Sequence, residues 1–307
     1  MLLDFSSQSA AFDTDDCASR VSRWGASSET GRLTDVLLSA PPHLTIVPCN
    51  EVSRDNLAKG LTAAPDVAER QHDRFAAALQ KTGVRCHFVP PVPDLPDLSF
   101  TRDSVTMSPW GLIELRPAAE HRRAETSHVA AVVRDLGVPI HDRIKEGTIE
   151  GGDVCLLRES LVLIGHSGER TDKAGANALG AMFAARGWEV IHTRFDPVYL
   201  HLDTILTVVA DDCAVVCLEA LDPDLLARLR DLGIELIPAT TEEVAILGAN
   251  LLSLGDGVVV APTGNDRVTD ALTARGFDVI KVEIDQFTQC GGGPHCLTMP
   301  LARHASR

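Results

Sequence analysis

Residues that could carry out chemistry stand directly before several short, strand-like runs of this sequence. They occur in DLSFTRD (Asp97 to Asp103), EGGD (Glu150 to Asp153) and HLD (His201 to Asp203), at Asn250, and in CGGGPHC (Cys290 to Cys296). Together they supply carboxylates, an imidazole and a thiol, which are the groups of nucleophilic and acid–base catalysis. Such chemistry requires that loops far apart in the sequence meet at one point.

The elements that must position these loops repeat along the chain. Five segments share an amphipathic helix end, a glycine, two further residues and a short run rich in β-formers. A residue without Cβ takes the left-handed conformation after a helix at low cost, so each glycine predicts a helix end with a strand soon after it. These glycines, at intervals of 43 to 54 residues, are Gly83, Gly137, Gly187, Gly233 and Gly276.

Before most of these helices the sequence predicts a β-hairpin, although the first unit, which contains GRLTDVLLS (Gly31 to Ser39), is less clear. The expected turns lie at residues 109–111, 158–160, 211–212 and 255–257. Hairpin, helix and strand repeated about five times at this period indicate a closed ring of α/β modules. If the first strands start at the same end of the ring, the polar residues before them converge.

The composition limits the classes of molecule that this protein can bind. The 307 residues include 43 acidic and 28 basic side chains, with a formal net charge of −15. Such a chain repels nucleic-acid phosphates and anionic membranes, and no concentrated basic patch offsets this. We therefore expect a small-molecule ligand, no nucleic acid and no membrane, and leave a homo-oligomer open. The polar N-terminus lacks the basic start of a signal peptide, which predicts a cytoplasmic protein whose eight cysteines are mostly reduced and buried.

At these residues the sequence resembles the guanidino-group-modifying superfamily of amidinotransferases and deiminases. It looks most similar to arginine deiminase, at the compact length of dimethylarginine dimethylaminohydrolase. The resemblance covers most of the chain and implies an α/β fold, the five-bladed ββαβ propeller called the pentein fold, with one catalytic domain at 28–307 after an N-terminal extension, 1–27. The matching stretches, in the family's own order, are SETGRLTDV (Ser28 to Val36), FTRD (Phe100 to Asp103), RRAET (Arg122 to Thr126), IEGGDV (Ile149 to Val154), GERT (Gly168 to Thr171), HLDT (His201 to Thr204) and GGGPHCLTMPLAR (Gly291 to Arg303).

The resemblance implies a reaction at a guanidinium group. A guanidinium is planar, cationic and unreactive, so an enzyme must hold it, attack it with a soft nucleophile and protonate the leaving nitrogen. Asp103 and Asp203 match the carboxylates that hold it through bidentate hydrogen bonds. Cys296 matches the nucleophile that forms a covalent amidino intermediate. His201 matches the acid and base for the leaving amine and the attacking water, and Glu150 orients it.

Other matched positions concern the rest of the substrate. Arg122 and Arg170 match cationic partners of a substrate α-carboxylate, and Phe100 and Gly293 match further substrate-binding residues. Asp97 departs from the deiminase motif, which has asparagine at this position. A carboxylate repels an α-carboxylate and attracts an amine, so the preferred substrate need not be free arginine.

The sequence thus predicts a hydrolase that converts arginine or an arginine derivative to citrulline or another ureido product, with release of ammonia or an alkylamine. An amidinotransferase, in which an acceptor amine takes the amidino group, uses the same residues. A propeller that binds guanidino ligands without catalysis is the third hypothesis. Each residue alone also fits a structural role, such as a buried thiol or a surface ion pair, but the matching stretches in one order favour the enzyme.

No cofactor is expected, because no nucleotide-binding glycine loop is present. Cys290, His295 and Cys296 could belong to a metal site or a disulfide. No second Cys/His pair at zinc spacing accompanies them, so we expect no metal.

Overall fold

Each predicted repeat contributes to a small three-stranded sheet. The computed structural model describes residues 23–304, and within them fifteen strands form five such sheets. In every sheet the middle strand pairs antiparallel with one neighbour and parallel with the other. With the middle strand second, the sheets are β15 (Met299–His304), β1 (Arg32–Ser39), β2 (Arg85–Val89); β3 (Val105–Ser108), β4 (Gly111–Glu114), β5 (Ile140–Arg143); β6 (Val154–Arg158), β7 (Leu161–His166), β8 (Glu189–Arg194); β9 (Leu206–Ala210), β10 (Cys213–Cys217), β11 (Glu235–Ala239); and β12 (Leu252–Gly255), β13 (Val258–Pro262), β14 (Asp278–Val282).

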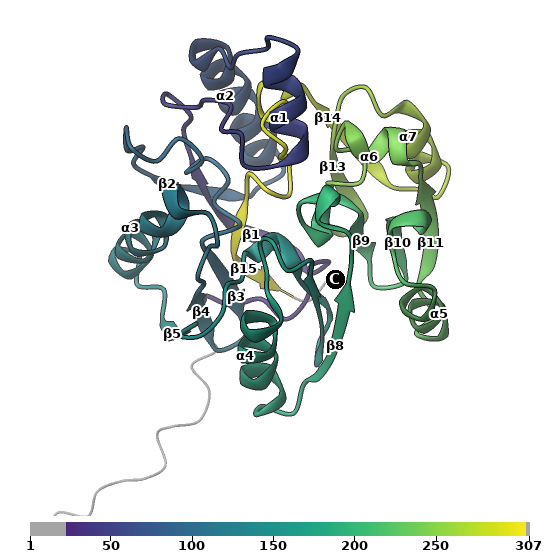
Figure 1. Ribbon diagram of the computed structural model, residues 1–307. Coiled ribbons are helices and arrows are strands. Elements are labelled where there is room, and N and C mark those ends of the chain that lie inside the picture. Colours follow the sequence, from purple (N-terminus) through teal and green to yellow (C-terminus); the bar gives the residue numbers. More distant parts are fainter. Residues whose placement is uncertain (1–22, 305–307) are drawn as a thin grey trace, which may run out of the picture.

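A helix connects the two parallel strands of every sheet, as parallel pairing requires a crossover. These crossover helices are α2 (Pro65–Lys81), α3 (Arg123–Asp135), α4 (Lys173–Ala184), α5 (Pro223–Asp231) and α7 (Asp266–Thr273). They lie on the outside of a ring of sheets (Figure 1). The predicted α/β fold, a five-bladed ββαβ propeller, is confirmed.

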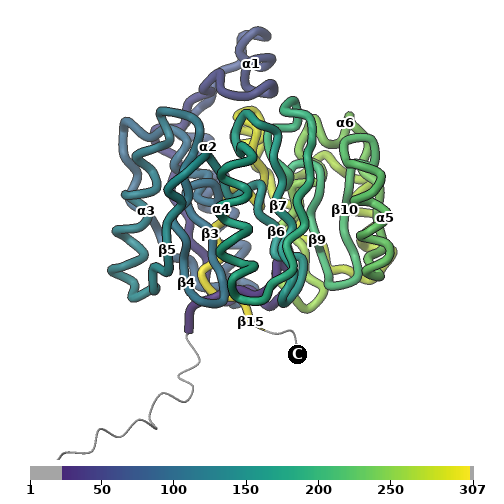
Figure 2. Tube along the Cα trace, turned by 60° about the horizontal axis from the view of Figure 1, so that its bottom comes forward, coloured from purple at the N-terminus to yellow at the C-terminus, as the bar shows by residue number. Residues whose placement is uncertain are grey.

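Shorter helices complete the chain. Three are α-helical, namely α1 (Glu51–Ala58), α6 (Thr241–Ala245) and α8 (Asp285–Thr288). The 3-10 turns are η1 (Glu120–Arg122), η2 (Gly151–Asp153), η3 (Pro197–Tyr199), η4 (Leu202–Thr204) and η5 (Leu218–Ala220). Figure 2 shows α1 standing above one end of the ring.

The five repeat glycines end their helices as predicted. Gly83, Gly137, Gly187, Gly233 and Gly276 all have positive φ, between 77° and 88°. The four expected hairpin turns also fall between the strands that they were predicted to join. Local sequence signals were therefore sufficient to predict the repeating unit.

The first sheet closes the ring. Its middle strand, β1, pairs with β15 from the other end of the described chain, with Arg32 opposite His304 and Leu37 opposite Met299. This explains why no hairpin partner is found near β1 in the sequence. Residues 23–27 pack on this closure, because Gly25 bridges to Ala302. The predicted extension otherwise lies outside the described residues, and its boundary stays a prediction.

The interior is formed by the strands, and the middle strands are almost wholly buried. Cys213 and Cys217 are buried on β10. All seven described cysteines are free thiols, but Cys49 and Cys86 are only half-buried; Cys17 lies outside the described residues. No helix within residues 23–304 is both long and apolar enough to cross a membrane.

Candidate active site

The predicted catalytic residues converge at one end of the ring, because each lies just before the first strand of its sheet. Asp103 precedes β3, Glu150 precedes β6, His201 precedes β9 and Cys296 precedes β15. Hydrogen bonds join neighbouring sheets here: the Gly152 N–H donates to Asp103 Oδ1 over 3.1 Å. The loops therefore form one connected site.

His201 and Glu150 form a buried pair. His201 is 1% exposed, and its Nε2 lies 2.9 Å from Glu150 Oε2. Burial disfavours the charged ring, but Asp103, Asp153 and Glu150 outweigh it and raise the pKa of His201 to about 10. Burial also opposes a charge on Glu150, yet Arg170 and His201 hold its pKa below the usual range. At neutral pH the pair is therefore an imidazolium and a carboxylate.

The second ring nitrogen of His201 remains available. Nδ1 is buried, has no hydrogen-bond partner within residues 23–304, and lies 3.8 Å from Asp103 Oδ1. A Cβ on Gly152 would lie 2.8 Å from the imidazole, so only glycine lets the Gly-Gly turn pass the ring. The protein thus fixes one nitrogen of His201 and leaves the other free to transfer a proton.

Cys296 lies in the C-terminal loop and is 2% exposed. Its Sγ is 3.1 Å from Asn250 Nδ2 and 3.4 Å from Asp203 Oδ2. Burial, together with the negative charges of Asp203 and Asp103, raises the pKa of this thiol well above its usual value. Cys296 is therefore a protonated thiol until a cation enters the site.

Asp203 lies behind the nucleophile. Its Oδ2 faces Cys296 Sγ and also accepts a hydrogen bond from His295 Nδ1 at 2.8 Å, while its Oδ1 has no partner in the described part of the chain. Asp203 does not line the same cavity as Cys296 and His201, but a separate small one. Of the two predicted aspartates, the structure thus brings only Asp103 into the cavity that Cys296 lines.

Arg122 and Arg170 are buried and paired with the site's own carboxylates. Arg122 Nη1 lies 2.5 Å from Asp103 Oδ2, and its other nitrogens contact Glu125 and two backbone carbonyls. Arg170 Nη1 donates to both oxygens of Glu150, at 3.0 and 2.8 Å. Both arginines therefore border the reaction centre, and their predicted contact with a substrate carboxylate stays a prediction.

Asp97, at the edge of the catalytic cavity, is paired with His121. Its Oδ2 lies 2.7 Å from His121 Nε2, and this hydrogen bond raises the pKa of His121 to about 9. The imidazolium offsets the carboxylate charge from which we expected repulsion of an α-carboxylate. The pair presents both signs of charge at the mouth of the site.

Phe100 and Gly293 shape the nucleophile's loop. The Phe100 ring is 5% exposed and packs edge-on against Phe287, with ring centroids 6.3 Å apart. A Cβ on Gly292 would lie only 2.3 Å from this ring, and one on Gly293 would lie 2.7 Å from the side-chain oxygen of Asn250. The glycines let the loop fit between the two side chains.

Sequence reasoning missed the residues that support the nucleophile. Asn250 Oδ1 accepts hydrogen bonds from the N–H groups of His295 and Cys296, at 3.1 and 3.3 Å. Glu29 faces His295 Nε2 at 3.4 Å and accepts from Arg102. Asn250 stood among the polar residues that precede a strand, and Glu29 stood within SETGRLTDV, but neither signal specified these contacts.

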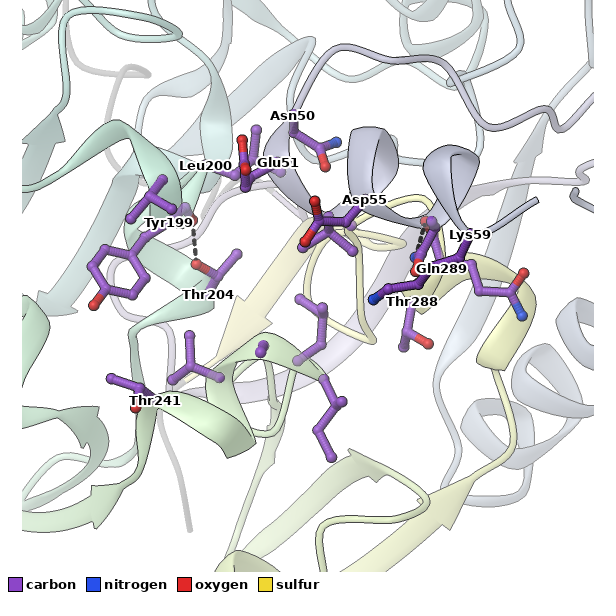
Figure 3. A pocket seen from close by; sticks show the side chains of 18 residues that line it. Asn50, Glu51, Asp55, Lys59, Tyr199, Leu200, Thr204, Thr241, Thr288 and Gln289 are labelled. Atoms are coloured by element: carbon purple, nitrogen blue, oxygen red, sulfur yellow. Dashed lines mark hydrogen bonds between the residues drawn. The ribbon is translucent and has the colours of Figure 1, made fainter. Parts of the chain in front are cut away.

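The catalytic cavity is small and opens toward a larger pocket. Asp103, His201, Cys296 and Phe100 are among the residues around about 20 Å³ of space. This is room for roughly one water, so the wall must move apart before a guanidinium enters. Asn50, Leu200 and Gly291 also border an outer pocket of about 540 Å³. Figure 3 shows that pocket, with α1 on one side and Tyr199 and Thr241 on the other.

Similarity to known proteins covers this whole site. The family model for eukaryotic N,N dimethylarginine dimethylhydrolases matches residues 45–303, which include every predicted catalytic and substrate-binding residue. The dimethylarginine dimethylaminohydrolase of Streptomyces coelicolor is 29% identical over 251 residues, covering 81% of this chain and 90% of the relative. An arginine deiminase of Rhodococcus erythropolis is 30% identical over 253 residues, covering 68% of this chain and 60% of the relative.

A solved structure of a relative also has a similar fold. A cysteine-to-serine mutant of the Pseudomonas aeruginosa dimethylarginine dimethylaminohydrolase, complexed with citrulline, aligns with a TM-score of 0.73 at 25% identity. The alignment covers 87% of this chain and 99% of that one. The two proteins thus share the fold over most of this chain.

Proposed function

Because this chain belongs to the N,N-dimethylarginine dimethylhydrolase family, and is thus a hydrolase acting on amidine C–N bonds of guanidino compounds, we propose that its substrate is arginine or an N-methylated arginine. The product is citrulline, and ammonia or an alkylamine leaves. The observation that carries the proposal is the convergence of Cys296, the His201–Glu150 pair and Asp103 around one cavity. A cytoplasmic location and a homo-oligomeric state stay predictions.

Binding of the substrate involves an exchange of guanidinium groups. Asp103 holds the guanidinium of Arg122, and the substrate's own guanidinium takes its place on this carboxylate. Arg122 is then free for the substrate's α-carboxylate, together with Arg170. Asp203 lies outside this cavity in the structure, so its Oδ1, unpartnered within residues 23–304, accepts from the other edge of the substrate once the wall beside Cys296 moves apart. The exchange replaces one charge-assisted hydrogen bond by another of similar strength.

The first chemical step attaches the amidino group to sulfur. The positive substrate favours loss of the Cys296 thiol proton, which passes to solvent because His201 is already protonated, and the thiolate then attacks the central carbon. His201 donates its Nδ1 proton to the leaving nitrogen, the C–N bond breaks, and an S-alkylthiouronium intermediate remains. Glu150 keeps the ring in place by its hydrogen bond to Nε2.

The second step returns the enzyme to its starting state. The neutral imidazole of His201 takes a proton from a water, whose oxygen attacks the amidino carbon. The C–S bond breaks, the departing sulfur takes the O–H proton of the new ureido group and becomes a thiol again, and the neutral ureido product dissociates. His201 is again an imidazolium, as its raised pKa favours.

The experiment is incubation of the purified protein with arginine, monomethylarginine, asymmetric dimethylarginine and agmatine. Citrulline, ammonia, the alkylamine and ornithine are measured separately, with Cys296→Ser as the matched inactive control. Citrulline with one equivalent of amine supports the proposal. Ornithine formed only when an acceptor amine is added indicates amidino transfer, and no product from any substrate refutes the proposed substrate class.

A further inference from the structure

A groove lined by arginines lies between α3 and the ends of β4 and β5, away from the catalytic cavity. Its volume is about 450 Å³, within the range of small-molecule pockets. Arg116 and Arg143 line it from the strand side, Arg123 and Arg134 line it from α3, and Glu114 is the one acid among the lining residues. Four guanidinium groups and one carboxylate leave three net positive charges, on a chain whose formal net charge is −15. Sequence reading found no basic patch because these arginines gather only in the fold.

Two of the arginines share a single carboxylate. Arg134 Nη2 donates to Glu114 Oε1 over 2.8 Å, and Arg143 Nη2 lies 3.1 Å from Glu114 Oε2. Glu114 is buried, whereas both arginine side chains are more than half exposed. One carboxylate thus holds two guanidinium groups close together and neutralises only one of them. The remaining positive charge favours a further anion beside them.

The other two arginines have no acidic partner within residues 23–304. Arg116 Nη1 donates to the carbonyl oxygen of Gly147 over 3.1 Å, which orients this guanidinium without neutralising it. Arg123 is exposed on the first turn of α3, and its side chain forms no ion pair in the described part of the chain. A guanidinium carries five N–H donors, so each arginine of the groove keeps donors for a ligand.

The fold does not require these charges. Glu114 and Arg143 are paired at the carboxyl ends of the parallel strands β4 and β5. None of the corresponding pairs in the other four sheets contains an acid, and three are uncharged: Ser39–Val89, His166–Arg194, Cys217–Ala239 and Pro262–Val282. Because exposed ion pairs add little to stability, folding alone does not explain the cluster.

We propose that this groove binds the diphosphate group of a small molecule. The planar fork of arginine matches phosphate oxygens through bidentate hydrogen bonds, and a diphosphate offers several such oxygens within a few ångströms. A terminal and an inner phosphate together carry about three negative charges at neutral pH, which equals the net charge of the groove in magnitude. An extended polyanion would meet the acidic remainder of the surface, whereas a small molecule meets the groove alone.

The groove is connected to the catalytic pair through the backbone. The N–H of Ile149 donates to the carbonyl oxygen of Arg116 over 2.9 Å, and the N–H of Ala118 donates to Glu150 Oε1 over 3.1 Å. A ligand that draws Arg116 toward itself therefore acts on the segment that holds Glu150. An effect on turnover rests on the proposed function, whereas binding of the diphosphate does not.

The test is isothermal titration calorimetry of the purified protein at low ionic strength, with inorganic pyrophosphate and ADP as separate titrants. We expect one equivalent of a probe to bind. The double variant Arg123→Gln, Arg143→Gln should weaken binding by about tenfold or more, because two charge-assisted contacts are lost. Glu114→Gln should strengthen binding by about threefold or more, because it removes the carboxylate that repels the ligand. Equal affinities support a site for free diphosphate, and tighter binding of ADP supports a site for a nucleoside diphosphate.

The matched control is the double variant Arg70→Gln, Arg74→Gln. It removes the same charge from exposed positions of another crossover helix, α2, outside the groove. Its affinity should stay within about twofold of wild type, because only long-range attraction changes. Equal losses in the two double variants, weaker binding by Glu114→Gln, or no binding of either probe up to about 1 mM overturns the proposal. The titration needs no turnover, so failure of this site and failure of the proposed hydrolysis are seen separately.

Discussion

Replacing Asn250 by alanine should release the loop that carries the nucleophile. Asn250 is fully buried, and its side chain makes four hydrogen bonds: to Asp203 O and Cys296 Sγ as donor, and from the N–H groups of His295 and Cys296 as acceptor. Alanine leaves these buried groups without partners. Within residues 23–304, no other side chain forms hydrogen bonds with both the sulfur and the backbone of Cys296.

The expected magnitude follows from these contacts. At about 1 kcal/mol for each hydrogen bond, Asn250→Ala should lower the free energy of unfolding by about 4 kcal/mol. A shift of the Cys296 loop by about 1 Å should lower kcat/KM by about a hundredfold. Asn265→Ala is the matched control. Asn265 is also buried, but its side-chain amide has no hydrogen-bond partner in the described residues. That variant should lose less than about 1 kcal/mol and keep its activity.

The assay combines urea denaturation with steady-state kinetics on the best substrate of the series. The rate of Cys296 alkylation is recorded in the same samples, because a freed loop exposes the thiol. If Asn250→Ala and Asn265→Ala unfold at the same urea concentration and turn over at similar rates, Asn250 does not hold the nucleophile. The geometry given for the loop is then irrelevant to catalysis.

Three further changes test other parts of the site. Arg122→Lys should reduce kcat/KM for arginine about 10- to 100-fold more than for agmatine, which lacks the carboxylate; equal losses in the two assays argue against that role. The raised pKa of His201 contributes stability that is fully present below pH 6.5 and is lost as pH rises through about 10. The free energy of unfolding of the wild type, measured by urea denaturation, should therefore exceed that of His201→Ala by less and less over that interval. An advantage that stays constant contradicts the buried imidazolium. Gly292→Ala should cost about 1 to 3 kcal/mol because its Cβ meets the Phe100 ring, and Phe100→Leu in the same chain should recover part of this loss in thermal unfolding; no recovery places the strain elsewhere.

The ring could be predicted because its signals are local. Each of the five repeat glycines has a positive φ and ends a helix within its own repeat. The turns between strands are equally short-range. The pairing of β1 with β15 could not be predicted in this way, since the two strands lie at opposite ends of the sequence. Helix α1 was also not anticipated, because it belongs to no repeat and stands above the ring.

The site was predicted as a set of residues, and of the contacts among them mainly that of Glu150 with His201 was anticipated. Their common position before the first strands was enough to bring Asp103, His201 and Cys296 together. The pairing of Arg122 with Asp103 depends on how a helix from one segment faces a loop from another, which spacing does not encode. The same holds for the groove lined by Arg116, Arg123, Arg134 and Arg143, whose members have no common motif.

The buried charges explain why a cationic substrate activates both reacting groups at once. Asp103 raises the pKa of Cys296 and also that of His201, so the site without substrate holds a neutral thiol and a firmly protonated imidazole. A guanidinium bound to Asp103 and Asp203 brings one more positive charge into the site, because Arg122 stays nearby after the exchange. The thiolate then suffers less repulsion and the imidazolium loses part of its stabilisation, so the nucleophile deprotonates and the acid becomes stronger. A neutral analogue of the same shape provides neither effect, so the charge of the ligand, as well as its shape, decides whether the enzyme can react with it.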